Sequence, residues 1–279
     1  MDVAVKKELQ KTALKVRMGI IEGVHAAKSG HPGGSLSCTE ILTYLYFKQM
    51  NIDPKNPKME GRDRFVLSKG HAAPALYAVL AERGFFDAEL LKNLRQPGCI
   101  LQGHPDMKKI PGVDMSTGSL GQGISAAVGM ALSAKHFGND FNVYAVLGDG
   151  EIEEGQVWEA AMFAANKGLS NLTAFVDYNN LQIDGTIEEV NSAMPIDKKF
   201  EAFNWHAIVI EDGNDFDQIE SALDEAMTID KPVAIIAKTV KGKGVSYMEN
   251  QVGWHGSAPN DELYEQAMSE LKAAYAELQ

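Results

Sequence analysis

The sequence predicts an α/β protein with a doubly wound, mostly parallel sheet and helices on both faces. Three observations predict it. Short, almost continuously apolar segments alternate with helix-length segments, as expected when parallel strands are buried on both faces. Polar clusters follow two of these apolar segments, at the strand ends where parallel sheets bind ligands. No Pro-, Gly- or Ser-rich linker and no repeat divides the 279 residues, so we expect a single domain over 1–279.

The elements are predicted in order from periodicity and stop signals. Between residues 6 and 28 apolar side chains recur at helical spacing, and Ser29-Gly30 then ends the helix. Further helices are expected after Ser37 and over 72–83, 154–167 and 216–227, with an irregular segment over 84–117 and a helical tail over about 260–279. Strands are expected where β-branched and aromatic residues gather, at 65–67, 141–147, 172–176, 206–210 and 232–237.

Composition and charge exclude several classes of protein. The chain is 45% hydrophobic and 23% charged, which is usual for a soluble globular protein and excludes a disordered or fibrous one. Its net charge of -12 argues against binding to nucleic acid or to anionic membranes. Two cysteines, no apolar signal-peptide core and no apolar run of about 20 residues predict a cytoplasmic protein.

The strongest chemical signal is Gly148-Asp149-Gly150 followed by Asn179-Asn180-Leu181. Each cluster follows a predicted strand, and the βαβ unit between them brings the two strand ends close together. Asp149 offers a carboxylate, Asn179 an amide oxygen and the loop a backbone carbonyl, which are oxygen ligands that Mg²⁺ takes together with phosphates. Either cluster alone would be read as an ordinary turn, but their pairing favours a site for Mg²⁺ and a diphosphate.

These clusters resemble the signature of thiamine-diphosphate enzymes, a sequence motif that begins with Gly-Asp-Gly and ends about 30 residues later with Asn-Asn. In that family the aspartate, the asparagine and a backbone carbonyl two residues later hold the Mg²⁺ that binds the cofactor's diphosphate. The resemblance therefore implies that Asp149, Asn179 and the carbonyl of Leu181 are metal ligands. It also implies that Gly150 and Asn179 contact the cofactor.

Four histidines stand beside glycine in predicted loops. They occur in Ser29-Gly30-His31-Pro32-Gly33, Ser68-Lys69-Gly70-His71, Gly103-His104-Pro105 and Trp254-His255-Gly256-Ser257-Ala258-Pro259. They do not form a zinc site, because no two have compact ligand spacing and no cysteine accompanies them. Together with segments 63–68 and 117–123, these loops resemble the N-terminal third of transketolase, and the resemblance covers almost the whole chain, from about Leu9 to Pro259.

The resemblance to transketolase implies a role for each of these histidines. His71 is expected to contact the cofactor diphosphate, and His255 to lie between the diphosphate and the substrate. His31 and His104 are expected to face the sugar, so His31, His104 and His255 are the predicted catalytic residues. The three other histidines lie in helix or strand candidates and are expected to be structural: His25, His136 and His206.

Further positions match family residues around the cofactor. The loop Gly118-Ser119-Leu120 corresponds to the one under the cofactor rings, although single-chain transketolases often have proline where Ser119 stands. Lys238 matches a lysine near the diphosphate, and Glu154 matches an interface glutamate that links paired active sites. A dinucleotide fingerprint over 118–129 is excluded, since the glycine order is wrong and no strand precedes it; the small residues there favour close helix packing.

The resemblance also implies a partner. In the family a glutamate of a pyrimidine-binding domain assists the cofactor's proton transfer, and this sequence ends at Gln279 without such a domain. We therefore expect the N-terminal subunit of a split transketolase, joined with a C-terminal subunit in an α2β2 heterotetramer of the pentose phosphate pathway. It would transfer a two-carbon ketol unit between phosphorylated sugars.

Three other kinds of thiamine-diphosphate protein are alternatives to a split transketolase. A deoxyxylulose-phosphate synthase-like subunit shares the cofactor and several motifs, but the loop from His255 to Pro259 looks more like transketolase. An inactive thiamine-diphosphate-binding regulatory relative would keep Asp149 and Asn179 but would need none of His31, His104 or His255. The alpha-type subunits of 2-oxoacid dehydrogenases are split as well, although the four-histidine set does not suit them.

Overall fold

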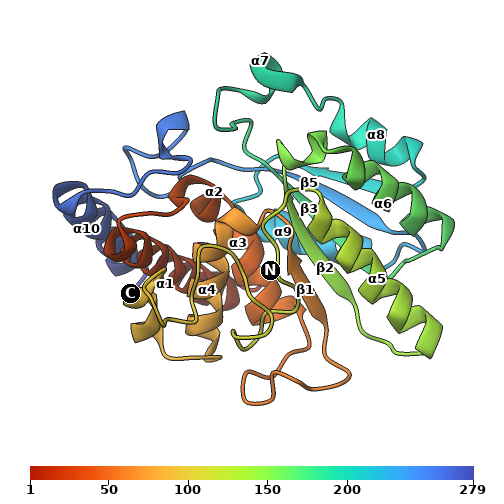
Figure 1. The fold of residues 1–279 in the computed structure, drawn as a ribbon, viewed down its shortest axis with the longest axis horizontal. Helices are drawn as coiled ribbons and strands as arrows, with labels where there is room; N and C mark the ends of the chain where they lie inside the picture. Colours follow the sequence, from red (N-terminus) through yellow and green to blue (C-terminus); the bar gives the residue numbers. More distant parts are fainter.

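The computed structural model describes residues 1–279 and contains one five-stranded sheet in the order β1-β2-β3-β5-β4, drawn in Figure 1. All four neighbouring strand pairs are parallel. This confirms the predicted parallel α/β class. The strands are β1 Arg64–Leu67, β2 Val143–Gly148, β3 Leu172–Tyr178, β4 His206–Ile210 and β5 Val233–Lys238.

Helices cover both faces of this sheet, as the sequence predicts. On one face lie α1 (Val3–Ala27), α3 (Thr39–Tyr44), α4 (Ala73–Arg83), α9 (Phe216–Ala226) and α10 (Asp261–Glu277). On the other face lie α5 (Gln122–Phe137), α6 (Gly155–Asn166) and α8 (Ile196–Ala202). The remaining short helices are α2 (Pro32–Ser37) and α7 (Ile187–Asn191). None of the helices is both long and apolar enough to span a membrane.

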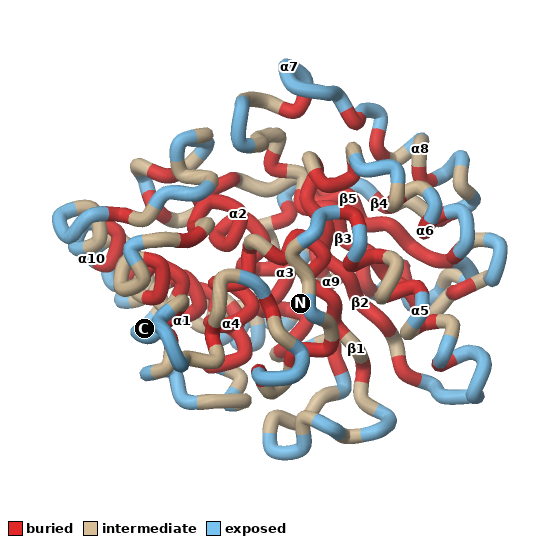
Figure 2. The backbone as a smooth tube through the Cα atoms, in the orientation of Figure 1, coloured by how far each residue is buried: buried red, intermediate tan, exposed pale blue.

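Alternation along the strands builds a separate core on each face. Successive strand side chains point to opposite faces, so in β2 Tyr144 and Val146 join one core while Val143, Ala145 and Leu147 join the other. The buried residues concentrate along the strands and on the sheet-facing sides of the helices in Figure 2. This two-sided burial explains why the strand segments are almost continuously apolar.

The structure differs from the sequence prediction at a few places. A short helix, α2, follows His31 directly where we expected only a loop; Pro32 occupies its first position, where a proline needs no hydrogen-bonded N–H. Strand β3 runs two residues further than predicted and so includes Asp177. The segment 84–117, expected to be irregular, contains a 3-10 turn at Ala88–Asn93. Gly129 does not serve close packing within this chain, because a Cβ there would meet no atom within 4 Å.

The topology gathers four chemically important loops at one edge of the sheet. Parallel strands β1, β2, β3 and β5 all end at this edge, and Gly148 pairs with Asp177 while Tyr178 pairs with Lys238 in the ladder. The residues that follow the strands are therefore neighbours in space although they are far apart in sequence. This edge is the place where doubly wound sheets bind ligands.

Candidate active site

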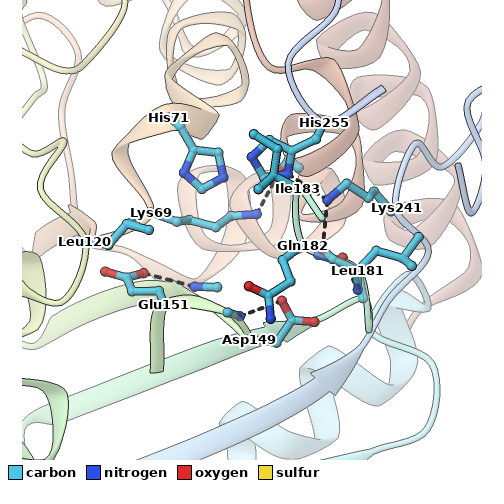
Figure 3. Close-up of a pocket in the computed structure, with 14 residues that line it drawn as sticks. Lys69, His71, Leu120, Asp149, Glu151, Leu181, Gln182, Ile183, Lys241 and His255 are labelled. Carbon is cyan, nitrogen blue, oxygen red and sulfur yellow. Dashed lines mark hydrogen bonds between the residues drawn. The ribbon is translucent and has the colours of Figure 1, made fainter. Parts of the chain in front are cut away.

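A cavity of about 290 Å³ opens at the carboxyl edge of the sheet. Its wall combines residues from the loops that follow β1, β2, β3 and β5, as Figure 3 shows. The chemically important lining residues are Lys69, His71, Asp149, Asn179, Lys241 and His255. The structure thus brings the predicted clusters 148–150 and 179–181 into one cavity, together with two of the four predicted histidines.

The three oxygens predicted to bind a metal lie around this cavity. Asp149 is 3% exposed, and its two carboxylate oxygens accept the backbone N–H groups of Gly150 at 2.9 Å and Asn180 at 2.6 Å. The side-chain oxygen of Asn179 accepts the N–H of Leu181 at 3.2 Å. These bonds fix the turn 179–181, in which Asn180 has a positive φ of 63°, so that the loop folds back over Asp149.

Burial raises the pKa of Asp149 to about 7, and the negative charge of Asp177 raises it further, while the two backbone N–H groups and Lys241 oppose the shift. Burial and the neighbouring negative charge both disfavour the carboxylate form of Asp149, whereas a divalent cation beside it would favour that form. The chain has no group of three or more His, Cys, Asp or Glu side chains that could hold a metal, so an ion here would depend on amide, carbonyl and phosphate oxygens.

Lys241 contacts one of the three oxygens predicted to bind the metal. Its Nζ donates to the carbonyl of Leu181 at 2.8 Å and lies 3.0 Å from Nδ1 of His255. Burial lowers the pKa of Lys241 to about 8, an effect that the nearby charge of Asp149 partly opposes. A buried ammonium group on the Leu181 carbonyl shows that this oxygen is oriented to bind a cation.

Lys69 forms the floor of the cavity together with a buried carboxylate behind it. Its Nζ is ion-paired with Asp177 and donates to the carbonyl of Gly34 at 2.6 Å. Asp177 is fully buried and also accepts hydrogen bonds from Ser37, at 2.6 Å, and from Thr239. Although burial disfavours the ammonium form, the charge of Asp177 raises the pKa of Lys69 above its usual value. Lys69 therefore stays charged at the cavity floor.

Three of the predicted histidines form a cluster beside these lysines. The ring centroids lie 5.3 Å apart for His31 and His71, 5.6 Å for His31 and His255, and 5.3 Å for His71 and His255. Burial lowers the pKa of His31 to about 4 and that of His255 to about 3, with a smaller contribution from Lys241 to each. Burial also lowers the pKa of His71 well below its usual value. All three imidazoles are thus neutral at physiological pH and can donate and accept hydrogen bonds.

His104 lies at the outer side of this cluster. Its backbone carbonyl accepts the Tyr77 hydroxyl at 2.9 Å, and its ring lies against Gly118, where a Cβ would come within 3.1 Å of the imidazole. Gly118 has a φ of 157°, so the close approach depends on glycine. Leu120 lines the main cavity, whereas Gly118 and Ser119 line an adjacent hollow. The structure therefore places this loop beside the cavity, in line with its predicted position.

Lys238 is not where the sequence analysis placed it. Its ammonium group pairs with Glu211 at 2.6 Å on an exposed part of the surface and does not line the cavity. The reason is the alternation of strand side chains: Lys238 is the last residue of β5 and points away from the site, whereas Lys241, in the loop beyond, turns back into it. Lys241 thus replaces Lys238 as the candidate lysine for the diphosphate.

Sequence reasoning also missed the role of Glu151. Glu151 is 2% exposed and accepts the N–H groups of Gly148 and Gly121 at 3.0 and 2.9 Å. It therefore ties the loop before α5 to the end of β2. No motif in the sequence indicates these long-range bonds; the only signal is its position directly after the 148–150 cluster.

Several residues outside the cavity have the structural roles that we expected. His25 stacks on Tyr264 with 4.1 Å between ring centroids and contacts Asp261 at 2.9 Å, which ties α1 to α10. His206 pairs with Glu225 at 2.7 Å.

Glu154 is exposed at the start of α6, where Gly121 packs against its Cβ. Its predicted interface role stays a prediction.

The residues present fit a diphosphate with a divalent cation. Two ammonium groups and two neutral imidazoles face one cavity that also contains the buried carboxylate of Asp149, whose pKa is raised. Charged and uncharged N–H donors of this kind bind phosphate oxygens, and the Asp149, Asn179 and Leu181 oxygens suit Mg²⁺.

Comparisons with known proteins agree with this geometry. Residues 9–276 match the family described as transketolase, thiamine diphosphate binding domain. The chain is 48% identical over 268 residues to the 6-deoxy-6-sulfo-D-fructose transketolase subunit of Clostridium sp. (strain MSTE9), covering 95% of this chain and 96% of that one. It is 43% identical over 265 residues to an apulose-4-phosphate transketolase subunit of Phocaeicola vulgatus, covering 95% of this chain and 94% of that one.

Longer relatives match over less than half of their length. Human transketolase is 43% identical over 273 residues, which make up 97% of this chain and 42% of that one. Among solved structures, the transketolase of Campylobacter jejuni superposes with a TM-score of 0.90 at 33% identity and covers 100% of this chain and 46% of that chain. The chain thus spans nearly all of the named subunits and less than half of these longer proteins.

Proposed function

The chain belongs to the transketolase family as a thiamine diphosphate-binding domain, and from this premise we propose that it is the diphosphate- and metal-binding subunit of a split transketolase. With a separate subunit it transfers a two-carbon ketol unit from a ketose phosphate to an aldose phosphate. The observation that carries the proposal is the convergence of Lys69, His71, Lys241 and His255 with Asp149 on one cavity. Two ammonium groups and two imidazoles that converge on one cavity with a carboxylate suit an anionic ligand with a bound cation.

The residues around the cavity bind different parts of the cofactor and its metal ion. Asp149, Asn179 and the Leu181 carbonyl hold Mg²⁺, while the Gly150 backbone, His71 and Lys241 contact the diphosphate, and Leu120 lies beside the cofactor rings. When bound, thiamine diphosphate supplies a nucleophilic carbon and an electron sink for cleaving the bond next to a ketose carbonyl. Lys69 keeps a positive charge behind the diphosphate because Asp177 holds it in place.

The neutral histidines act on the sugar. His31 and His255 contact each other edge to face, with 5.6 Å between ring centroids, so both rings can reach one hydroxyl or carbonyl oxygen that lies beside the pair. Lys241 donates to Nδ1 of His255, which leaves Nε2 of that ring as the proton-bearing atom. His255 can therefore donate a hydrogen bond from Nε2, and His104 adds a further imidazole at the outer side.

A partner subunit is supported by the exposed apolar face that α5 and α6 present. Phe137 is 74% and Met162 60% exposed, and Phe163 and Leu120 are also exposed. The ends of the two helices are held together, since Lys135 donates to the carbonyls of Lys167 and Gly168 at 2.8 Å. Large apolar side chains exposed on two adjoining helices suit a protein interface. We propose that this face binds the subunit carrying the pyrimidine-binding domain, in an α2β2 assembly.

The test is reconstitution with that subunit, thiamine diphosphate and Mg²⁺. We expect ketol transfer from xylulose 5-phosphate to ribose 5-phosphate in the mixture and none with either chain alone. Because the relatives named above act on a sulfonated fructose and on apulose 4-phosphate, both are assayed as donors. Transfer from one of these alone would place the enzyme outside the pentose phosphate pathway, and activity of the isolated chain would contradict the proposal.

The two alternatives give different results in the same experiment. A deoxyxylulose-phosphate synthase-like subunit would consume pyruvate with glyceraldehyde 3-phosphate and release carbon dioxide. A regulatory relative would bind thiamine diphosphate but show no turnover with any partner or donor. Neutral imidazoles at His31, His104 and His255 favour the sugar transferase, since cofactor binding alone needs none of them at the substrate side.

A further inference from the structure

One buried carboxylate, that of Glu151, connects three parts of the cavity wall. One of its oxygens accepts the N–H of Gly121 at 2.9 Å and the hydroxyl of Ser68, and the other accepts the N–H of Gly148 at 3.0 Å. Figure 3 shows Glu151 at the same side of the cavity as Leu120. Each donor is the chain neighbour of a residue that lines the cavity: Ser68 precedes Lys69, Gly148 precedes Asp149 and Gly121 follows Leu120.

The three donors require a carboxylate. Both oxygens of a carboxylate accept hydrogen bonds, whereas an amide offers one oxygen and an NH₂ group that only donates. Glutamine at position 151 would keep its oxygen toward Gly148, which is fixed in the β2–β3 ladder, and direct its NH₂ group toward Ser68, whose hydroxyl can turn to accept. The N–H of Gly121 would then lack an acceptor. Because Glu151 is 2% exposed, little water can reach this N–H to replace the lost acceptor.

The loop 117–121 is held differently on its two sides. Beside the end of β1 it packs closely at a glycine, since a Cβ on Gly70 would come within 2.7 Å of the backbone N of Gly118. Toward the end of β2 it is hydrogen-bonded through Glu151. Loss of the bond from Gly121 should therefore free the loop, which carries Leu120, from the strand end that precedes Asp149.

We propose that Glu151 is a positioning residue that sets the separation between the two ends of the cofactor site. This rests on the proposed function, in which Asp149 holds Mg²⁺ with the diphosphate and Leu120 lies beside the cofactor rings. A carboxylate that binds Gly148 with one oxygen and Gly121 with the other keeps both ends in place before the cofactor arrives. Such preorganisation strengthens the binding of a ligand that spans both ends more than that of a ligand that occupies only one.

The test compares two ligands of different length. Thiamine diphosphate spans both ends of the site, whereas inorganic pyrophosphate occupies only the metal end. Each is titrated, together with Mg²⁺, into the assembly of this chain with the pyrimidine-domain subunit. In Glu151→Gln we expect the affinity for thiamine diphosphate to fall by about 10-fold or more, because the freed loop has to be ordered again when the rings bind. The affinity for pyrophosphate should change by less than about 3-fold.

Two further variants separate this role from a general effect on folding. Ser68→Ala removes one donor but leaves Gly121 and Gly148 joined through Glu151, so both affinities should stay within about 3-fold of the wild type. If Glu151→Gln does not fold, Glu151→Asp is used instead. Its carboxylate keeps the charge but is one CH₂ group shorter and cannot reach both N–H groups, so it should show the same selective loss.

Equal losses of affinity for thiamine diphosphate and pyrophosphate, or no loss for either, would overturn this role of Glu151. The proposed function is tested separately, because the binding measurements need no sugar. A wild-type assembly that binds thiamine diphosphate but transfers no ketol unit from any donor would refute the proposed function, while the comparison of the two ligands would still decide the role of Glu151.

Discussion

At the scale of single residues, Asp149 is the one on which the proposed cation binding depends most directly. It is the only carboxylate among the three predicted metal ligands, and burial raises its pKa to about 7. Asp149→Asn keeps the shape but removes the charge that a divalent ion would balance. We expect the affinity for thiamine diphosphate with Mg²⁺ to fall by more than about 100-fold, since even outer partners of a metal ligand contribute 10- to 100-fold.

Calorimetric titration of the cofactor at several Mg²⁺ concentrations measures this effect. Asp184→Asn is the matched control, because Asp184 is an exposed carboxylate of the nearby loop and its loss should leave the affinity unchanged. Unchanged affinity in Asp149→Asn as well would exclude the predicted metal site.

His255 gives the stability of the cofactor-free chain a specific pH dependence. Burial, assisted by Lys241, lowers the pKa of His255 to about 3, whereas the unfolded chain has an ordinary value near 6.5. Between these pH values the unfolded chain binds a proton at His255 that the folded chain does not bind. Lowering the pH from about 6.5 toward 4 therefore destabilises the fold through this residue.

His255→Asn removes this contribution. We expect the variant to become more stable relative to the wild type as the pH falls from 6.5 to 4, so that the free energy of unfolding of the variant minus that of the wild type increases. Urea denaturation of both proteins at pH 6.5, 5.5 and 4.5 measures the difference. A difference that stays constant over this range would show that the imidazole titrates normally in the folded chain.

At the scale of elements, the sequence allowed most strands and helices to be located because their signals are local. Strand β4 matches its predicted range at both ends, and α4 differs from its prediction by one residue at its start. Helix α2 was missed because six residues with two glycines and a proline carry no helical periodicity. Its stability comes from tertiary burial, since all six residues are buried.

The residues of the candidate site likewise differ in whether a local sequence pattern marks them. Asp149 and Asn179 could be predicted because each stands in a dense local motif at a strand end. Lys241 could not, since the groups that it contacts, the Leu181 carbonyl and His255, are contributed by other loops and no sequence spacing encodes those contacts. The interpretation of Lys238 failed for a related reason. Lys238 lies at the end of β5, next to the site in sequence, but its side chain points outward and pairs with Glu211.

Helix α10 stabilises the fold by packing on α1. Leu271 is 1% exposed in the shared core, together with Ala267 and Met268. Leu271→Ala should lower the free energy of unfolding by about 2–4 kcal/mol, through lost burial and the cavity left behind. Lys272→Ala, at the next and exposed position, should change it by less than about 0.5 kcal/mol. Equal values in urea denaturation would mean that α10 does not stabilise the rest of the chain.

At the scale of the whole molecule, the proposed cofactor site and the proposed partner face lie on different parts of the chain. The cavity is built from the strand-end loops, whereas the exposed apolar side chains lie on α5 and α6. Leu120 joins the two, because it lines the cavity and is itself 37% exposed. A partner that covers this face would therefore also close the cavity on one side.

Met162→Asp tests this arrangement. A buried, unpaired carboxylate in an apolar interface is strongly unfavourable, so we expect the variant to lose complex formation with the pyrimidine-domain subunit by at least about 100-fold, and ketol transfer with it. The variant chain alone should unfold like the wild type, because Met162 is 60% exposed. Met227→Asp introduces the same charge at an exposed methionine just after α9, on the opposite face of the sheet, and should assemble normally. Light scattering of the mixed subunits measures both, and assembly of Met162→Asp at wild-type affinity would place the partner on another face.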